Sequence, residues 1–136
     1  MKKIAAISMS LALMLSLSTV TALALGGSSG AKNKKVTVAV IKAEWCSACQ
    51  KVDPIMMDLM KEYGDRINFV ILDVTNDETT AQAAAKAKSL GLASFFEANK
   101  KKTSTVGVFK SGRQTFVTAK NYNKSDYEAA FNKALS

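Results

Sequence analysis

The spacing of apolar residues changes along the chain, and each spacing predicts one kind of element. Residues 36–41 are mostly β-branched and almost entirely apolar, which predicts a strand buried on both faces, as in a parallel sheet. Residues 67–74 predict the next strand. Residues 105–110 and 114–118 predict two more strands, joined by a Ser-Gly turn. The last two strands therefore form a hairpin.

The first helix is expected to follow residue 46. Its apolar positions, spaced alternately by one and three residues, form a single stripe: Val52, Ile55, Met56, Leu59, Met60 and Tyr63. Gly64 is suited to end this helix just after its C-cap. Pro54 lies inside the helix and lacks a backbone donor, so we expect a kink near residues 50–54 and interpret Pro54 as structural.

Three shorter helical patterns complete the prediction. Thr75 and Glu78 are spaced as a capping box for an Ala-rich helix that runs to Leu90 and stops at Gly91. A short helix ending at Asn99 is expected to contain two phenylalanines. Ser125-x-x-Glu128 is spaced to cap a last helix, which buries Tyr127, Ala130, Phe131, Ala134 and Leu135.

The main elements follow in the order β-α-β-α-β-β-α. A β-α-β unit followed by a hairpin predicts an α/β fold, with a central mixed β-sheet flanked by helices on both faces. The 136 residues suffice for one such domain and not for two.

The N-terminal region has a different composition from the rest. Lys2 and Lys3 are followed by an apolar run from residue 4 to residue 25 and by the small-x-small site Ala22-Leu23-Ala24, as in a secretory signal. We expect a signal peptide at 1–24, a flexible Gly/Ser linker at 25–35 and the folded domain at 36–136. The protein is then exported, to the periplasm or the extracellular space. The alternative is an uncleaved anchor, which would make a membrane the partner of this segment.

Composition excludes several chemistries. The chain has no histidine, which rules out Ser-His-Asp triads, Cys-His pairs and His-ligated metals. Its two cysteines cannot fill a four-cysteine metal site, so we expect no metal and no cofactor apart from the cysteine pair itself. The formal charge is +8, yet no nucleic-acid motif accompanies it, and we expect no nucleic-acid partner.

The segment Trp45-Cys46-Ser47-Ala48-Cys49 stands where a buried strand gives way to a helix. The free N–H groups and the dipole at a helix N-terminus stabilise a thiolate, so the pKa of Cys46 should lie below about 8.5. Two intervening residues let the sulfurs meet across one turn and cycle between dithiol and disulfide. Cys46 is then the attacking thiol and Cys49 the shielded one. An inert disulfide staple and a metal site with outside ligands remain as alternatives.

With this motif in place, the chain resembles the thioredoxin family. The resemblance rests on Ala43-Glu44-Trp45-Cys46-x-x-Cys49, on Pro54 eight residues after the first cysteine, on the strand at 69–74 and on Phe109-Lys110-Ser111-Gly112. It implies a three-layer thioredoxin-like fold with a reduced N-terminal β-α unit, because only residues 31–35 precede the first strand.

The resemblance also implies an activity, namely thiol–disulfide exchange through a mixed disulfide. Cys46 would be the nucleophile, Cys49 the resolving cysteine, and Trp45 part of the adjacent surface. Substrates would be protein thiols or disulfides, a second redox protein would be the partner, and we expect a monomer. The rival interpretation is a non-enzymatic binding module of the same fold with a structural Cys46–Cys49 disulfide.

The sequence departs from the family pattern at two positions. Val40 stands where thioredoxins bury an aspartate, and Ser104 stands where they place a cis-proline. We expect the Thr103–Ser104 bond to be trans, because a non-proline cis bond costs about 2.5–4 kcal/mol. Thr103 and Ser104 should face the cysteine pair, with the Ser104 hydroxyl or backbone approaching Cys46. Together with Trp45, Ser47 and Ala48 they would shape the substrate site.

Three consecutive lysines, residues 100–102, precede this loop. They could form a positive rim that stabilises the Cys46 thiolate and attracts an acidic partner. The alternative is an ordinary solvated loop, since most runs of charge are solvated.

Overall fold

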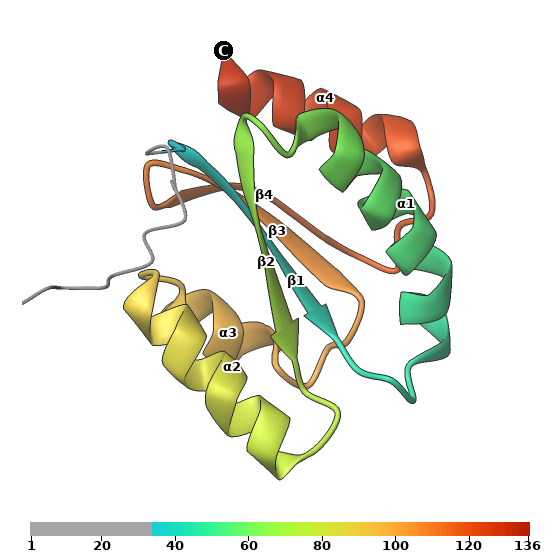
Figure 1. Ribbon diagram of the computed structural model, residues 1–136, viewed down its shortest axis with the longest axis vertical. Helices are drawn as coiled ribbons and strands as arrows, with labels where there is room; N and C mark the ends of the chain where they lie inside the picture. The colour runs from blue at the N-terminus through green and yellow to red at the C-terminus, as the bar shows by residue number, and fades with distance from the viewer. Residues whose placement is uncertain (1–33) are drawn as a thin grey trace, which may run out of the picture. The chain divides into compact units, whose positions relative to one another are not determined.

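The computed structural model describes residues 34–136 of the chain (Figure 1). The predicted signal peptide, its cleavage site and most of the predicted linker lie outside the described residues. The elements are β1 (Val36–Lys42), α1 (Ser47–Tyr63), β2 (Ile67–Asp73), α2 (Asp77–Ser89), α3 (Ala93–Asn99), β3 (Thr105–Lys110), β4 (Arg113–Ala119) and α4 (Lys124–Leu135). No helix in this part of the chain combines the length and the apolar character needed to cross a bilayer.

The four strands form one mixed sheet in the order β2-β1-β3-β4. β1 pairs in parallel with β2 and antiparallel with β3, and β3 pairs antiparallel with β4. β1 is therefore an interior strand, which explains why its sequence is apolar on both faces. The predicted α/β class and mixed sheet are confirmed.

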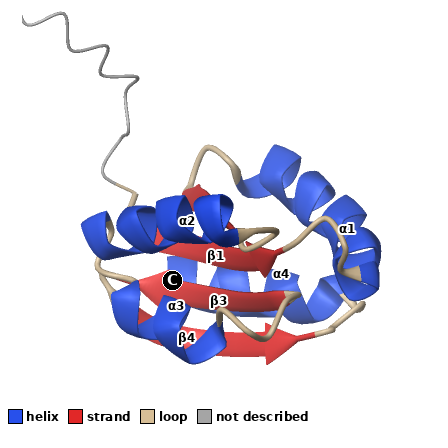
Figure 2. Ribbon diagram, turned by 90° about the horizontal axis from the view of Figure 1, so that it is seen from below, coloured by secondary structure: helices blue, strands red, loops and turns tan. Residues whose placement is uncertain are grey.

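Helices cover both faces of this sheet, as Figures 1 and 2 show. On one face, α1 and α4 bury an aliphatic and aromatic cluster that includes Val38, Leu59 and Phe131. On the other face, α2 and α3 pack over a second cluster that includes Ile41 and Phe96. The second cluster also contains both cysteines, so the start of α1 is packed against the core.

The expected caps differ from the observed ones because nearby asparagines compete for the position. α2 is capped by Asn76, whose side chain accepts from the Thr79 N–H at 2.9 Å, and not by Thr75. α4 is capped by Asn123, two residues before Ser125. Asn is at least as good an N-cap as Ser or Thr.

Gly64 and Gly91, the two glycines predicted to end helices, both lie just after a helix. Gly91 has φ +72° after α2, as expected of a residue that stops a helix. α1 ends at Tyr63 as expected, and Gly64, with φ −59°, is its C-cap, one position earlier than predicted. α1 is a single helix that continues through Pro54.

Tyr127 makes the free energy of unfolding depend on pH in the alkaline range. Its ring is fully buried in α4, and its hydroxyl donates to the Asn121 backbone oxygen at 2.7 Å. Burial raises the pKa of Tyr127 to about 12. An unfolded chain releases this proton near pH 10, so between about pH 10 and 12 it binds fewer protons than the folded protein.

The free energy of unfolding should therefore fall as pH rises through that range. Tyr127→Phe should flatten the fall, at the cost of about 1 kcal/mol at neutral pH for the lost hydrogen bond. Urea unfolding between pH 8 and about pH 12 measures both effects. Tyr122→Phe is the matched control, since Tyr122 is 47% exposed. Equal pH profiles for the two variants would contradict this assignment.

Candidate active site

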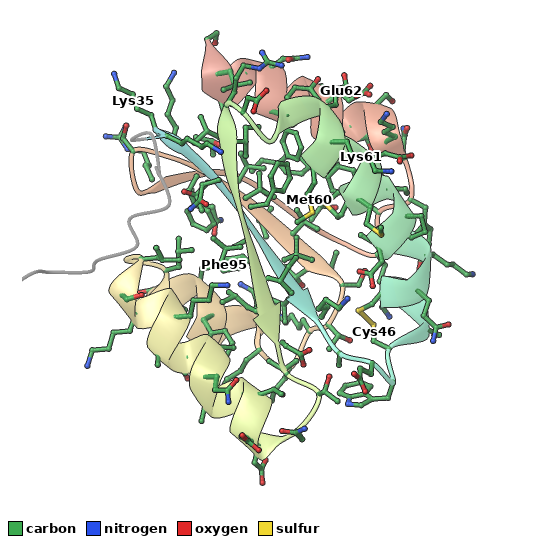
Figure 3. All side chains as sticks on the ribbon, viewed as in Figure 1. Lys35, Cys46, Met60, Lys61, Glu62 and Phe95 are labelled. Atoms are coloured by element: carbon green, nitrogen blue, oxygen red, sulfur yellow. A yellow bond between two sulfur atoms is a disulfide. The ribbon has the colours of Figure 1, made fainter. Side chains whose placement is uncertain are left out.

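The two cysteines form a disulfide at the first turn of α1, with their Cα atoms 5.2 Å apart. Figure 3 shows Cys46 where α1 begins, beyond the end of β1. Cys46 is the N-cap residue, and its sulfur accepts from the Cys49 N–H at 3.1 Å. An N-cap side chain serves the otherwise unpaired N–H groups of the first turn, and a negative charge strengthens that interaction. This position can therefore stabilise a thiolate on Cys46.

Trp45 is held in place by the loop that follows β2. Its indole N–H donates to the Thr75 backbone oxygen at 3.0 Å, although 66% of the residue is exposed. The Glu44 N–H donates to the Thr75 hydroxyl at 3.0 Å. The Thr75 N–H in turn donates to the Asp73 carboxylate at 2.8 Å. Hydrogen bonds from Thr75 lower the pKa of Asp73, with the larger effect from its side chain and a smaller one from its backbone N–H. They keep this carboxylate ionised.

A pocket of about 370 Å³ opens beside the disulfide. Its lining consists of Trp45, Cys46, Ser47, Ala48, Lys51, Thr103, Lys120 and Tyr122. Five of the residues singled out from the sequence thus come together, whereas Cys49 and Ser104 are absent from the lining. Both cysteines are buried, with Cys46 5% and Cys49 2% exposed, so the lining of the pocket is what distinguishes Cys46 from Cys49.

Sequence reasoning missed Lys51, Lys120 and Tyr122. Lys51 lies on α1 just beyond the cysteines, and its charge alone does not distinguish it from other surface lysines. Lys120 and Tyr122 lie between β4 and α4, more than seventy residues from Cys46. Only the pairing of β4 with β3 brings them to the pocket, so no local pattern could have indicated them.

Ser104 is held by two backbone hydrogen bonds. The described residues contain no cis peptide bond, so the expected trans Thr103–Ser104 bond is confirmed. However, the Ser104 N–H donates to the Ile41 oxygen at 2.8 Å, and its carbonyl accepts from the Lys120 N–H at 3.2 Å. Its buried hydroxyl has no hydrogen-bond partner within residues 34–136. Both backbone groups of Ser104 thus bond to other residues, and its hydroxyl makes no hydrogen bond to Cys46 in this disulfide form. The expected approach of Ser104 to the Cys46 thiolate stays a prediction.

The Lys100–Lys102 segment behaves as a solvated loop. Lys100 pairs with Glu97 at 2.5 Å, and the next two lysines are exposed. None of the three lines the pocket, so the positive rim comes from Lys51 and Lys120 instead.

The position of Val40 lies on the α1 side of the sheet. Val40 is 2% exposed and belongs to the apolar cluster under α1 and α4. The partly exposed ion pair Lys42–Asp53, at 2.8 Å, joins the end of β1 to α1. The core at Val40 is thus apolar where thioredoxins have a carboxyl group.

These features define an α/β protein with a disulfide at a helix N-terminus, a tryptophan immediately before it and an adjoining pocket. The family profile named Thioredoxin matches residues 29–121. The chain belongs to the thioredoxin family.

Curated relatives share short stretches with this chain. The thiol:disulfide interchange protein TxlA homolog of Synechocystis sp. is 37% identical over 46 residues, which are 34% of this chain and 26% of that protein. The thioredoxin-like protein HCF164 of rice chloroplasts is 41% identical over 44 residues, 32% of this chain and 17% of that protein. The chain thus matches about a quarter or less of the length of these two relatives.

Solved structures support the fold. The thioredoxin of Malassezia sympodialis aligns with a TM-score of 0.54 at 22% identity, covering 76% of this chain and 80% of that structure. That of Fasciola hepatica gives 0.53 at 20% identity, covering 74% and 82%. Identities this low establish the three-layer fold and no more.

Proposed function

We propose that this protein is an exported thiol–disulfide oxidoreductase that acts on protein thiols or disulfides through Cys46 and Cys49. The observation that carries the proposal is the unequal placement of the two sulfurs. Cys46 lines the pocket and caps α1, whereas Cys49, one turn further along the helix, does not line the pocket. Membership of the thioredoxin family and the printed name of the Synechocystis relative support it.

In the reducing direction, the Cys46 thiolate attacks one sulfur of a substrate disulfide. The other substrate sulfur leaves as a thiolate and takes a proton from water, and a mixed disulfide remains on Cys46. The Cys49 thiol loses its proton and attacks the Cys46 sulfur, which releases the second substrate thiolate. Two electrons pass from the protein dithiol to the substrate. Oxidation of a substrate dithiol follows the same steps in reverse.

The residues around the pocket have separate roles in this proposal. Trp45, Ser47, Ala48 and Thr103 form the rim that a substrate segment contacts. Ser104 positions the loop through its two backbone hydrogen bonds instead of touching the substrate. Protein substrates, a second redox protein and a monomeric state remain part of the proposal, as does the absence of a metal or other cofactor.

The direct test follows Trp45, the one tryptophan in the chain, as a fluorescent reporter beside the disulfide. Reduced protein should exchange with a disulfide-bonded peptide at least about a hundredfold faster than a model thiol. After mild reduction, one cysteine should alkylate rapidly and the other slowly. Equal, slow alkylation together with exchange no faster than the model thiol would favour the binding module.

The mass of protein from the exported fraction should correspond to a chain that begins at Leu25.

A further inference from the structure

The pocket beside Cys46 carries positive charge and no negative charge. Lys51 and Lys120 both line it, and none of its eight lining residues is Asp or Glu. The two lysines come from α1 and from the segment after β4, so the fold brings them to the same side of the disulfide. A thiol–disulfide exchange site is thereby joined to a small cationic surface.

These charges are not neutralised within the described part of the chain. Its ion pairs engage Lys42, Lys61, Lys100 and Lys124, and leave Lys51 and Lys120 out. The Lys51 ammonium instead lies 5.6 Å from the centre of the Tyr122 ring. A cation–π contact orients an ammonium group without removing its charge.

The second lysine is fixed through its backbone. Lys120 has φ +53°, and its N–H donates to the Ser104 carbonyl. That hydrogen bond ties the segment after β4 to the loop that contains Thr103. This hydrogen bond therefore connects the loop beside the Cys46 pocket with Lys120, which carries one of the two positive charges of the pocket.

We propose that this pocket selects acidic substrate segments, in which Asp or Glu residues flank the cysteine that Cys46 attacks. The inference rests on the proposed exchange activity and specifies its substrate class. Carboxylates beside the reacting sulfur would interact with Lys51 and Lys120, while the rings of Trp45 and Tyr122 cover the apolar part of the segment. The carboxylates take no part in the covalent step, which remains the two-electron exchange given above.

The experiment compares two disulfide-bonded peptides that differ only in two residues next to the reacting cysteine, Glu in one and Gln in the other. The measured quantity is the ratio of their second-order rate constants with reduced protein. Exposed ion pairs of this kind are worth about threefold each, so we expect a ratio of about tenfold at low salt. The ratio should fall below about threefold at 0.5 M salt, where screening acts within a few ångströms.

The double variant K51Q/K120Q should reduce the ratio to less than about twofold. The matched control is K101Q/K102Q, which removes the same charge from exposed residues outside the pocket. The control should retain most of the wild-type ratio. Because each ratio is taken within one variant, any change in the nucleophilicity of Cys46 cancels.

A wild-type ratio near one, or equal losses in the two double variants, would overturn the selection of acidic segments while leaving the exchange activity intact. Failure of the wild-type protein to react with either peptide would overturn the proposed function, and the inference with it.

Discussion

Replacement of Cys46 by serine is expected to abolish disulfide exchange, whereas replacement of Cys49 by serine should stop the reaction halfway. Serine at position 46 supplies no thiolate, and turnover should drop by at least about a hundredfold, to the uncatalysed background. In Cys49→Ser, Cys46 can still attack, but no second thiol resolves the product. The substrate should then remain bound through a mixed disulfide.

Mass spectrometry after incubation with a disulfide-bonded peptide distinguishes the two outcomes. Cys49→Ser should gain the mass of the peptide, and the adduct should disappear on addition of dithiothreitol. Cys46→Ser should gain far less, because Cys49 is 2% exposed and does not line the pocket. Ser47→Ala is a control for the removal of a polar atom at the same turn. Preferential trapping by Cys46→Ser would reverse the assigned roles.

Ser104→Pro is expected to destabilise the fold by roughly 3 kcal/mol, although proline is the residue that thioredoxins have at this position. Ser104 has φ +67°, and a proline ring holds φ near −65°. Proline also lacks the N–H that donates to the Ile41 oxygen at 2.8 Å, which would leave a buried acceptor at the end of β1. Serine therefore suits the trans backbone of this loop, whereas proline does not.

Ser104→Gly tests the same argument in the opposite direction. Glycine adopts positive φ without the penalty of about 1–2 kcal/mol that other residues have. The substitution also removes a buried hydroxyl that has no hydrogen-bond partner within residues 34–136. The greater flexibility of glycine in the unfolded chain offsets about 0.5–1 kcal/mol. We therefore expect a gain of about 1 kcal/mol, measured as a higher urea midpoint with the disulfide intact.

A Ser104→Pro protein as stable as the wild type would show that this loop has another conformation.

Features of the chemistry that depend on neighbouring residues were predictable without coordinates. Cys46 and Cys49 are three residues apart at a strand-to-helix junction, and this spacing alone brings their sulfurs together. The apolar stripe of α1 followed in the same way from its periodicity. Errors of one or two residues arose at the caps of α2 and α4, where Asn76 and Asn123 compete with Thr75 and Ser125. Adjacent residues of similar capping ability differ too little for a pattern to separate them.

The spacing of its own residues thus determines the class of this protein, the order of its elements and the position of its reactive pair. The tertiary structure decides the surroundings of that pair. It places Lys120 and Tyr122 beside Cys46, and it directs the backbone of Ser104 toward Ile41 and Lys120. The physical reason is range: helix periodicity and an i, i+3 cysteine pair act within a few residues, whereas the pocket requires the β3–β4 pairing to carry distant segments to one end of the sheet. The charge around the reacting sulfur is therefore a property of the fold.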